Sequence, residues 1–164
     1  MKRILSIALC VLIFITCAAF AESTEASMTR KEGEAVVADL VALWEENGIY
    51  ITLPKPSAAA LEGRLLYRIS NGSWESTQIT LIYDYAKHDE DDNRIFYISL
   101  PDDYAPTRDI CALSFSYFLQ MEVEDCYDLY DSLVYNCING MTERVVNGYN
   151  IVFGITSFSI LLEE

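Results

Sequence analysis

Apolar residues recur along this chain with two different periods, and the first of them is helical. Four residues lie three or four positions apart: Val37, Leu40, Val41 and Trp44. This spacing predicts a helix that packs one side against a core. Asn47-Gly48 follows, and Gly48 is suited to the left-handed conformation that ends many helices.

Shorter segments alternate with a period of two, which is typical of strands. We expect strands at residues 49–53, 65–69, 78–86, 94–100, 143–146 and 149–162. In the last of these, Phe153 and Phe158 have opposite parity, so we expect a bulge or bend near Gly154. Asn147-Gly148 is a predicted turn.

The loop between the strands at 65–69 and 78–86 determines which side chains share a face. A two-residue turn at Asn71-Gly72 would place the two apolar sets on opposite faces of the sheet. We therefore predict a three-residue loop, Asn71 to Ser73, that places Leu65 opposite Ile79.

Residues 107–137 predict two further helices, with a break at residues 121–124. Thr107 is a candidate N-cap for the first. Its apolar face would be Ile110, Leu113, Tyr117 and Met121, and that of the second Val123, Tyr127, Tyr130, Val134 and Cys137. One long helix is the alternative.

The order of these elements predicts an α+β fold. We expect an antiparallel sheet of about six strands, with the N-terminal helix and the two-helix insertion packed mainly on one face. Residues 32–164 would form a single domain, preceded by a polar tether at 22–31.

The N-terminus has the pattern of a secretory signal peptide. Lys2 and Arg3 precede an apolar run, and Ala19 and Ala21 are small residues where a signal peptidase reads them. We expect cleavage after Ala21 and a secreted or extracytoplasmic protein; the alternative is an N-terminal membrane anchor.

Charge narrows the range of partners. After cleavage, 9 basic residues remain against 25 acidic ones, which is a net charge of −16. A chain this acidic repels phosphate groups, so we expect neither nucleic acid nor an anionic membrane surface as a partner. The partner would be an unknown protein or a glycan.

The loop at residues 86–93 concentrates acidic residues around the single histidine, His88. Asp89, Asp91 and Asn93 have the spacing of the first calcium ligands in a calcium-binding loop. However, Arg94 and Leu100 occupy the positions where such a loop needs Gly and Glu. A solvent-exposed hairpin tip is the favoured interpretation, with no metal and no cofactor.

Three cysteines remain after cleavage: Cys111, Cys126 and Cys137. If the two helices are antiparallel, Cys111 and Cys137 are equally far from the break and form the candidate disulfide. Three buried free thiols are the alternative.

The sequence contains none of the common catalytic motifs. Any Ser-His-Asp or Cys-His arrangement would have to use His88, which we expect at a solvent-exposed hairpin tip. Paired carboxylates remain the one catalytic option, with Asp84, Asp102 and Asp103 at expected strand ends. Aromatic residues on the strands offer a possible binding surface instead: Trp74, Tyr83, Tyr85 and Tyr97.

These observations favour a non-catalytic binding module outside the cytoplasm. An exposed aromatic patch or an unpaired sheet edge would support it. A carrier of a small ligand, with an apolar cavity between sheet and helices, is the first alternative. A hydrolase with two converging carboxylates is the second.

Overall fold

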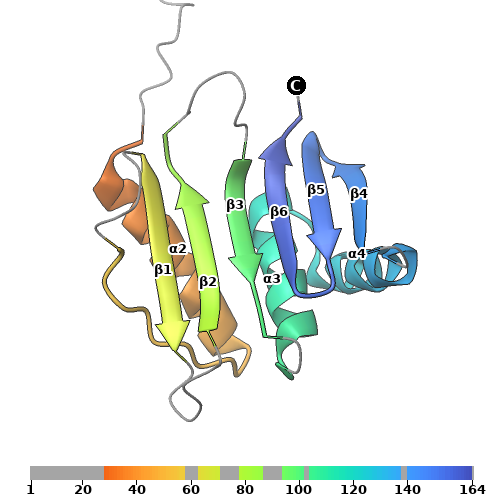
Figure 1. Cartoon of the computed structure of the whole chain (residues 1–164), viewed down its shortest axis with the longest axis horizontal. Coiled ribbons are helices and arrows are strands. Elements are labelled where there is room, and N and C mark those ends of the chain that lie inside the picture. Colours follow the sequence, from red (N-terminus) through yellow and green to blue (C-terminus); the bar gives the residue numbers. More distant parts are fainter. Residues whose placement is uncertain are drawn as a thin grey trace, which may run out of the picture.

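The computed structural model describes residues 28–57, 63–70, 78–86, 94–101, 104–137 and 140–163. The helices are α2 (Arg30–Glu46), α3 (Thr107–Leu119) and α4 (Val123–Asn136). The strands are β1 (Arg64–Ser70), β2 (Gln78–Asp84), β3 (Arg94–Ser99), β4 (Met141–Val146), β5 (Tyr149–Gly154) and β6 (Ser157–Leu162). They form one antiparallel sheet in the order β1-β2-β3-β6-β5-β4, and the helices lie behind one face of it (Figure 1). The predicted α+β class is confirmed.

Helix α2 begins two residues inside the segment expected to be a tether. Thr29 is its N-cap, and Thr29 and Glu32 form a reciprocal capping box. The hydrogen bonds that Thr29 donates lower the pKa of the Glu32 carboxyl. The predicted apolar stripe is buried, and Gly48 has the positive φ of 83° expected after the helix end.

Gly33 lets α2 approach the sheet closely. A Cβ atom at this position would lie 2.9 Å from the Cβ of Tyr85, which follows β2. Glycine lowers helix stability, so its place in the first turns of α2 is explained by this contact. A side chain here would push the helix away from the end of β2.

The predicted register of β1 and β2 is wrong, although its parity is right. Leu65 pairs with Tyr83 and Ile69 with Ile79, so residues 71–77 separate the strands. The expected pairing of Leu65 with Ile79 would have shortened the connection to three residues. Burial decides which face a side chain takes, but several registers of the same parity satisfy it.

No strand forms at residues 49–53. Ile49 and Ile51 are buried, but their segment is not a strand of the sheet. Farther along the chain, the Ser57 N–H donates to the carbonyl oxygen of Leu66 at 2.7 Å. The alternating pattern in this segment therefore reflects burial of its side chains and not membership of the sheet.

Residues 107–136 form two helices with a break between them, as predicted, and not the single long helix that was the alternative. Gln120 adopts a left-handed conformation with φ of 54°, which ends α3 before α4 begins. Thr107 is not the N-cap of α3, because Pro106 occupies that position. Thr107 is the first helical residue, and its hydroxyl donates to the Tyr104 carbonyl at 2.6 Å.

The buried face of α4 differs from the predicted one. Cys126, Leu129, Leu133 and Cys137 at its C-cap are buried. Val134 is 44% exposed, and Tyr127 and Tyr130 pack only at the margin of the core. Large aromatic residues dominated the sequence pattern, but the helix turns its smaller side chains inward, where it lies against α3.

Two tight turns connect the last three strands. Asn147 and Gly148 have φ of 52° and 79°, as a two-residue turn between β4 and β5 requires. The expected single strand at 149–162 with a bulge or bend near Gly154 is wrong: Ile155 and Thr156 form a second turn, so β5 and β6 are separate strands. Phe153 pairs with Phe158, which explains the change of parity.

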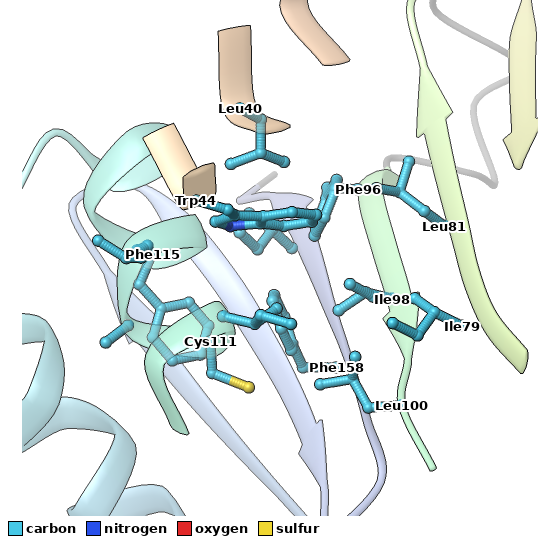
Figure 2. Packing of buried hydrophobic residues seen from close by; sticks show 14 of the residues in the cluster. Leu40, Trp44, Ile79, Leu81, Phe96, Ile98, Leu100, Cys111, Phe115 and Phe158 are labelled. Atoms are coloured by element: carbon cyan, nitrogen blue, oxygen red, sulfur yellow. The ribbon is translucent and has the colours of Figure 1, made fainter. Parts of the chain in front are cut away.

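The core lies between the helices and one face of the sheet. Trp44 and Leu40 from α2 point toward Phe96 of β3, and Phe115 from α3 lies near Phe158 of β6 (Figure 2). The ring centroids of Phe115 and Phe158 are 4.8 Å apart. These contacts hold the three described helices on one side of the sheet.

Candidate functional site

The face of the sheet opposite the helices presents apolar side chains to the outside. Because side chains alternate along a strand, this face holds the residues between the core positions. We call it the open face; its half-buried members include Leu66, Ile82, Tyr97, Val152 and Leu161, with Ser99, Ser157 and Ser159 among them. In Figure 1, the helices α2, α3 and α4 all lie on the other side of the sheet.

A shallow hollow of about 280 Å³ lies on the open face. Its lining includes Tyr97 of β3, Met141 of β4, Val152 and Gly154 of β5, and Ser157 and Ser159 of β6. An aromatic ring, apolar side chains and hydroxyl groups thus meet in one place. Such a lining can contact a protruding side chain or a sugar ring.

The four aromatic residues expected to form a surface do not share one. Tyr97 lies on the open face, where the Arg94 guanidinium is 6.0 Å from its ring centroid. Tyr83 lies in the core, and burial raises the pKa of its phenol. Tyr85 packs against Gly33, and Trp74 lies outside the described residues. The alternation of Phe96 and Tyr97 in the sequence was the signal that distinguishes the two faces.

The two edges of the sheet differ. At the β1 edge, the backbone of Ser57 bonds Leu66. At the β4 edge, Met141, Glu143 and Val145 direct their backbone N–H and C=O groups away from β5, because the tight turn makes Val146 and Tyr149 a hydrogen-bonded pair. Within the described ranges, no backbone group bonds to this side of β4.

Most of the large exposed apolar residues in the described ranges lie near the β4 edge, whereas Tyr50 lies in the connection after α2. Among the described residues, the large exposed ones are Met141, Val145, Val134, Tyr135, Ile155 and Tyr50. Val134 and Tyr135 end the helix that leads into β4, and Ile155 follows Gly154, the partner of Met141. Sequence reasoning missed this edge, because strand order is not visible in a hydrophobic pattern.

Of the three acidic residues considered for catalysis, the described ranges include only Asp84. Asp84 is buried and receives two hydrogen bonds from Arg64, one of them 2.9 Å long. Asp102 and Asp103 lie outside the described residues. So do His88 and the calcium candidates Asp89, Asp91 and Asn93, which stay a prediction. The described ranges contain no group of three His, Cys, Asp or Glu side chains placed to hold a metal ion.

The three cysteines are buried and free in the structure. Burial, followed by the charge of Asp125, raises the pKa of the Cys126 thiol to about 11, and burial also raises that of Cys111. The Cys137 thiol donates to the carbonyl oxygen of Phe153 at 3.7 Å. Thiols of this kind are poor nucleophiles. The candidate disulfide between Cys111 and Cys137 stays a prediction for the exported protein.

Within the described ranges, every helix is too short or too polar to cross a bilayer. Comparison with protein-family models, with curated proteins and with solved structures found no match to this chain. The open face and the β4 edge are therefore interpreted from their own geometry.

Proposed function

We propose that this chain is a secreted or envelope-associated, non-catalytic binding module that contacts its partner through the open face. The observation that supports this proposal is the one-sided fold. In the part of the chain that the structure describes, three helices cover one face of a six-stranded sheet, and half-buried apolar side chains occupy the other. Apolar side chains grouped on a surface are typical of interaction sites.

The partner would be a protein or a glycan outside the cytoplasm. Tyr97 offers a ring that can stack on an apolar group or a sugar, and Ser157 and Ser159 offer hydroxyl groups beside it. The large negative charge of the chain disfavours nucleic acid and anionic lipid and favours basic partners.

Export through the predicted signal peptide belongs to the same proposal. If it is correct, the mass of the protein recovered outside the cytoplasm equals that of residues 22–164. A mass that retains residues 1–21, found with the membrane fraction, would instead identify an N-terminal anchor. Unreduced and reduced masses of the denatured protein would differ by two hydrogens if Cys111 and Cys137 are bonded.

A carrier of a small ligand is the second candidate. The hollow of about 280 Å³ is close to the lower limit of ligand pockets, which hold roughly 300–1,000 Å³. It lies on the open face and not between sheet and helices, where a carrier was expected to hold its ligand. A native mass with a stoichiometric adduct that is lost on denaturation would favour this candidate.

Site-specific crosslinking tests the binding module. The photoreactive residue p-benzoylphenylalanine replaces Tyr97 in one variant and Tyr50 in another, because Tyr50 is 81% exposed in the connection after α2. Both substitutions keep an aromatic ring. We expect irradiation of producing cells to yield a discrete crosslinked product from position 97 and none from position 50. Equal yields at both positions, or none at either, would refute the open face as the contact surface.

A further inference from the structure

We propose that β4 binds an extended peptide segment as an additional strand of the sheet, and that this segment has a basic residue between two apolar ones at alternate positions. The inference rests on the proposed binding function and specifies the chemistry of its partner. It concerns the β4 edge, whereas the proposed function concerns the open face beside it.

The backbone of β4 provides the first argument. Met141, Glu143 and Val145 point their N–H and C=O groups outward, and no described backbone group bonds to them. An incoming strand would bond to the same three residues without breaking the β4–β5 ladder. The opposite edge lacks this opportunity at Leu66, because the connection after α2 already bonds there.

The side chains of these three residues provide the second argument. They lie on the open face, where Met141 and Val145 are 66% and 54% exposed and Glu143 is also exposed. Residues directly opposite on paired strands contact each other. An added strand would therefore place apolar side chains opposite Met141 and Val145 and a basic side chain opposite Glu143. The order apolar, basic, apolar is symmetrical, so the bound segment could pair with β4 in either the parallel or the antiparallel orientation.

A second copy of this chain fits the edge less well. Two-fold antiparallel pairing places open-face residues opposite open-face residues, so the registers that use most of β4 centre on Glu143 or on Arg144. In the first register the two copies of Glu143 would lie directly opposite each other, and in the second the two copies of Arg144 would, so each places like charges together. Glu143 and Arg144 thus act against self-pairing, as charged residues do on other edge strands.

The charge of the whole chain agrees with the side chains of β4. A net charge of −16 after cleavage attracts basic segments over a longer distance than a single contact does. Exposed Val134 and Tyr135 on α4 add apolar surface next to this edge, since Ser132 of the same helix accepts a hydrogen bond from Arg144 at 3.0 Å.

The test uses two blocked synthetic peptides, one with the sequence Ser-Thr-Val-Thr-Lys-Thr-Val-Thr-Ser and one with Glu in place of Lys. Binding to the mature protein is followed by fluorescence anisotropy and by amide shifts in NMR spectra. We expect the Lys peptide to bind at least fivefold more tightly than the Glu peptide. We expect the Glu143→Lys variant to reverse this preference, because it exchanges the charge at the centre of the strand.

Two substitutions at one position test the backbone contact. Val145→Pro removes an outward N–H and leaves the bonds to β5 intact, since proline is tolerated on edge strands. Val145→Thr keeps the N–H and the branched shape. We expect binding of the Lys peptide to weaken at least tenfold in the first variant and less than threefold in the second, with unchanged circular dichroism in both.

Three outcomes would overturn the assignment of the edge: no binding of the Lys peptide, equal binding of both peptides, or equal loss of binding in both Val145 variants. These outcomes do not affect the crosslink expected at position 97, which tests the open face separately. The proposed function could therefore be correct even if the assignment of the β4 edge is wrong. Self-association of the mature protein that Val145→Pro abolishes would overturn the peptide partner in favour of a second copy.

Discussion

Arg64 and Asp84 stand directly opposite each other on β1 and β2, and the guanidinium bonds both carboxylate oxygens. Asp84 is 7% exposed, so the guanidinium replaces most of the water that would otherwise contact its carboxylate. The pair favours this register of the two strands over the others that the apolar residues leave open, because it requires Arg64 and Asp84 to lie opposite each other. The ion pair indicates a structural role for Asp84, which was one of the acidic residues considered for catalysis from the sequence.

Removal of this carboxylate charge should destabilise the fold. We expect Asp84→Asn to lower the free energy of unfolding by about 2–4 kcal/mol, because it removes the buried negative charge that bonds the Arg64 guanidinium. Urea denaturation measures the change. Glu34→Gln is the matched control, since the Arg30–Glu34 pair on α2 is exposed and should contribute less than about 0.5 kcal/mol. Equal effects of the two substitutions would contradict the structural role of Asp84.

Gly33→Ala should destabilise the protein although alanine favours helices. The gain in helix propensity is about 1 kcal/mol. The added methyl group would lie 2.9 Å from the Cβ of Tyr85, and overpacking of this kind costs about 1–3 kcal/mol. We expect a net loss of about 1 kcal/mol in thermal or urea unfolding. In a Tyr85→Gly background the same substitution should stabilise the protein. A stabilising Gly33→Ala substitution in the parent protein would show that α2 can move away from Tyr85 at little cost.

Asn147 has two roles that two substitutions separate. Its side-chain amide donates to the Leu119 carbonyl at the end of α3, 3.0 Å away, and its φ of 52° is left-handed. Asn147→Gly removes only the hydrogen bond and should cost about 1 kcal/mol. Asn147→Ala adds backbone strain and should cost about 2 kcal/mol. If glycine proved as costly as alanine in urea unfolding, strain would not contribute.

Alkaline pH should destabilise the protein in part through Cys126. Its thiol pKa is raised from 9.0 to about 11 by burial, so above pH 9 the unfolded chain releases this proton while the folded protein still holds it. The stabilisation is therefore complete below pH 9 and declines as the pH rises toward 11. Between pH 8 and 10.5, the free energy of unfolding of the Cys126→Ala variant should fall by about 1–2 kcal/mol less than that of the parent protein. Leu129→Ala, a buried substitution without a titratable group on the same helix, is the control and should keep the parental pH dependence in urea unfolding. If its pH dependence were as weak as that of Cys126→Ala, the role of the thiol would be contradicted.

Much of the fold follows from local patterns. The stripe from Val37 to Trp44 predicted α2, and Asn147-Gly148 predicted a turn whose φ values the structure confirms. The break between α3 and α4 was also predicted. These features depend on neighbours within a few positions, so the sequence contains their causes.

The errors involve partners that are distant in the sequence. The parity of β1 and β2 followed from burial, but the register also depends on pairings such as Arg64 with Asp84. The change of parity near Gly154 was visible, yet a bulge and a tight turn produce the same pattern. Ile49 and Ile51 alternate as strand residues do, although their segment is not part of the sheet.

The sequence by itself determined the α+β class, the acidic charge, the candidate signal peptide and the alternation of faces, because these depend on composition and on short-range periodicity. Only the tertiary structure decided that β4 is a sheet edge, that Tyr97 and Tyr83 lie on opposite faces, and that Asp84 is paired with Arg64. Strand order depends on which segments meet in three dimensions, and one hydrophobic pattern is compatible with many such orders. The candidate binding surface therefore became visible only when the strands were assembled.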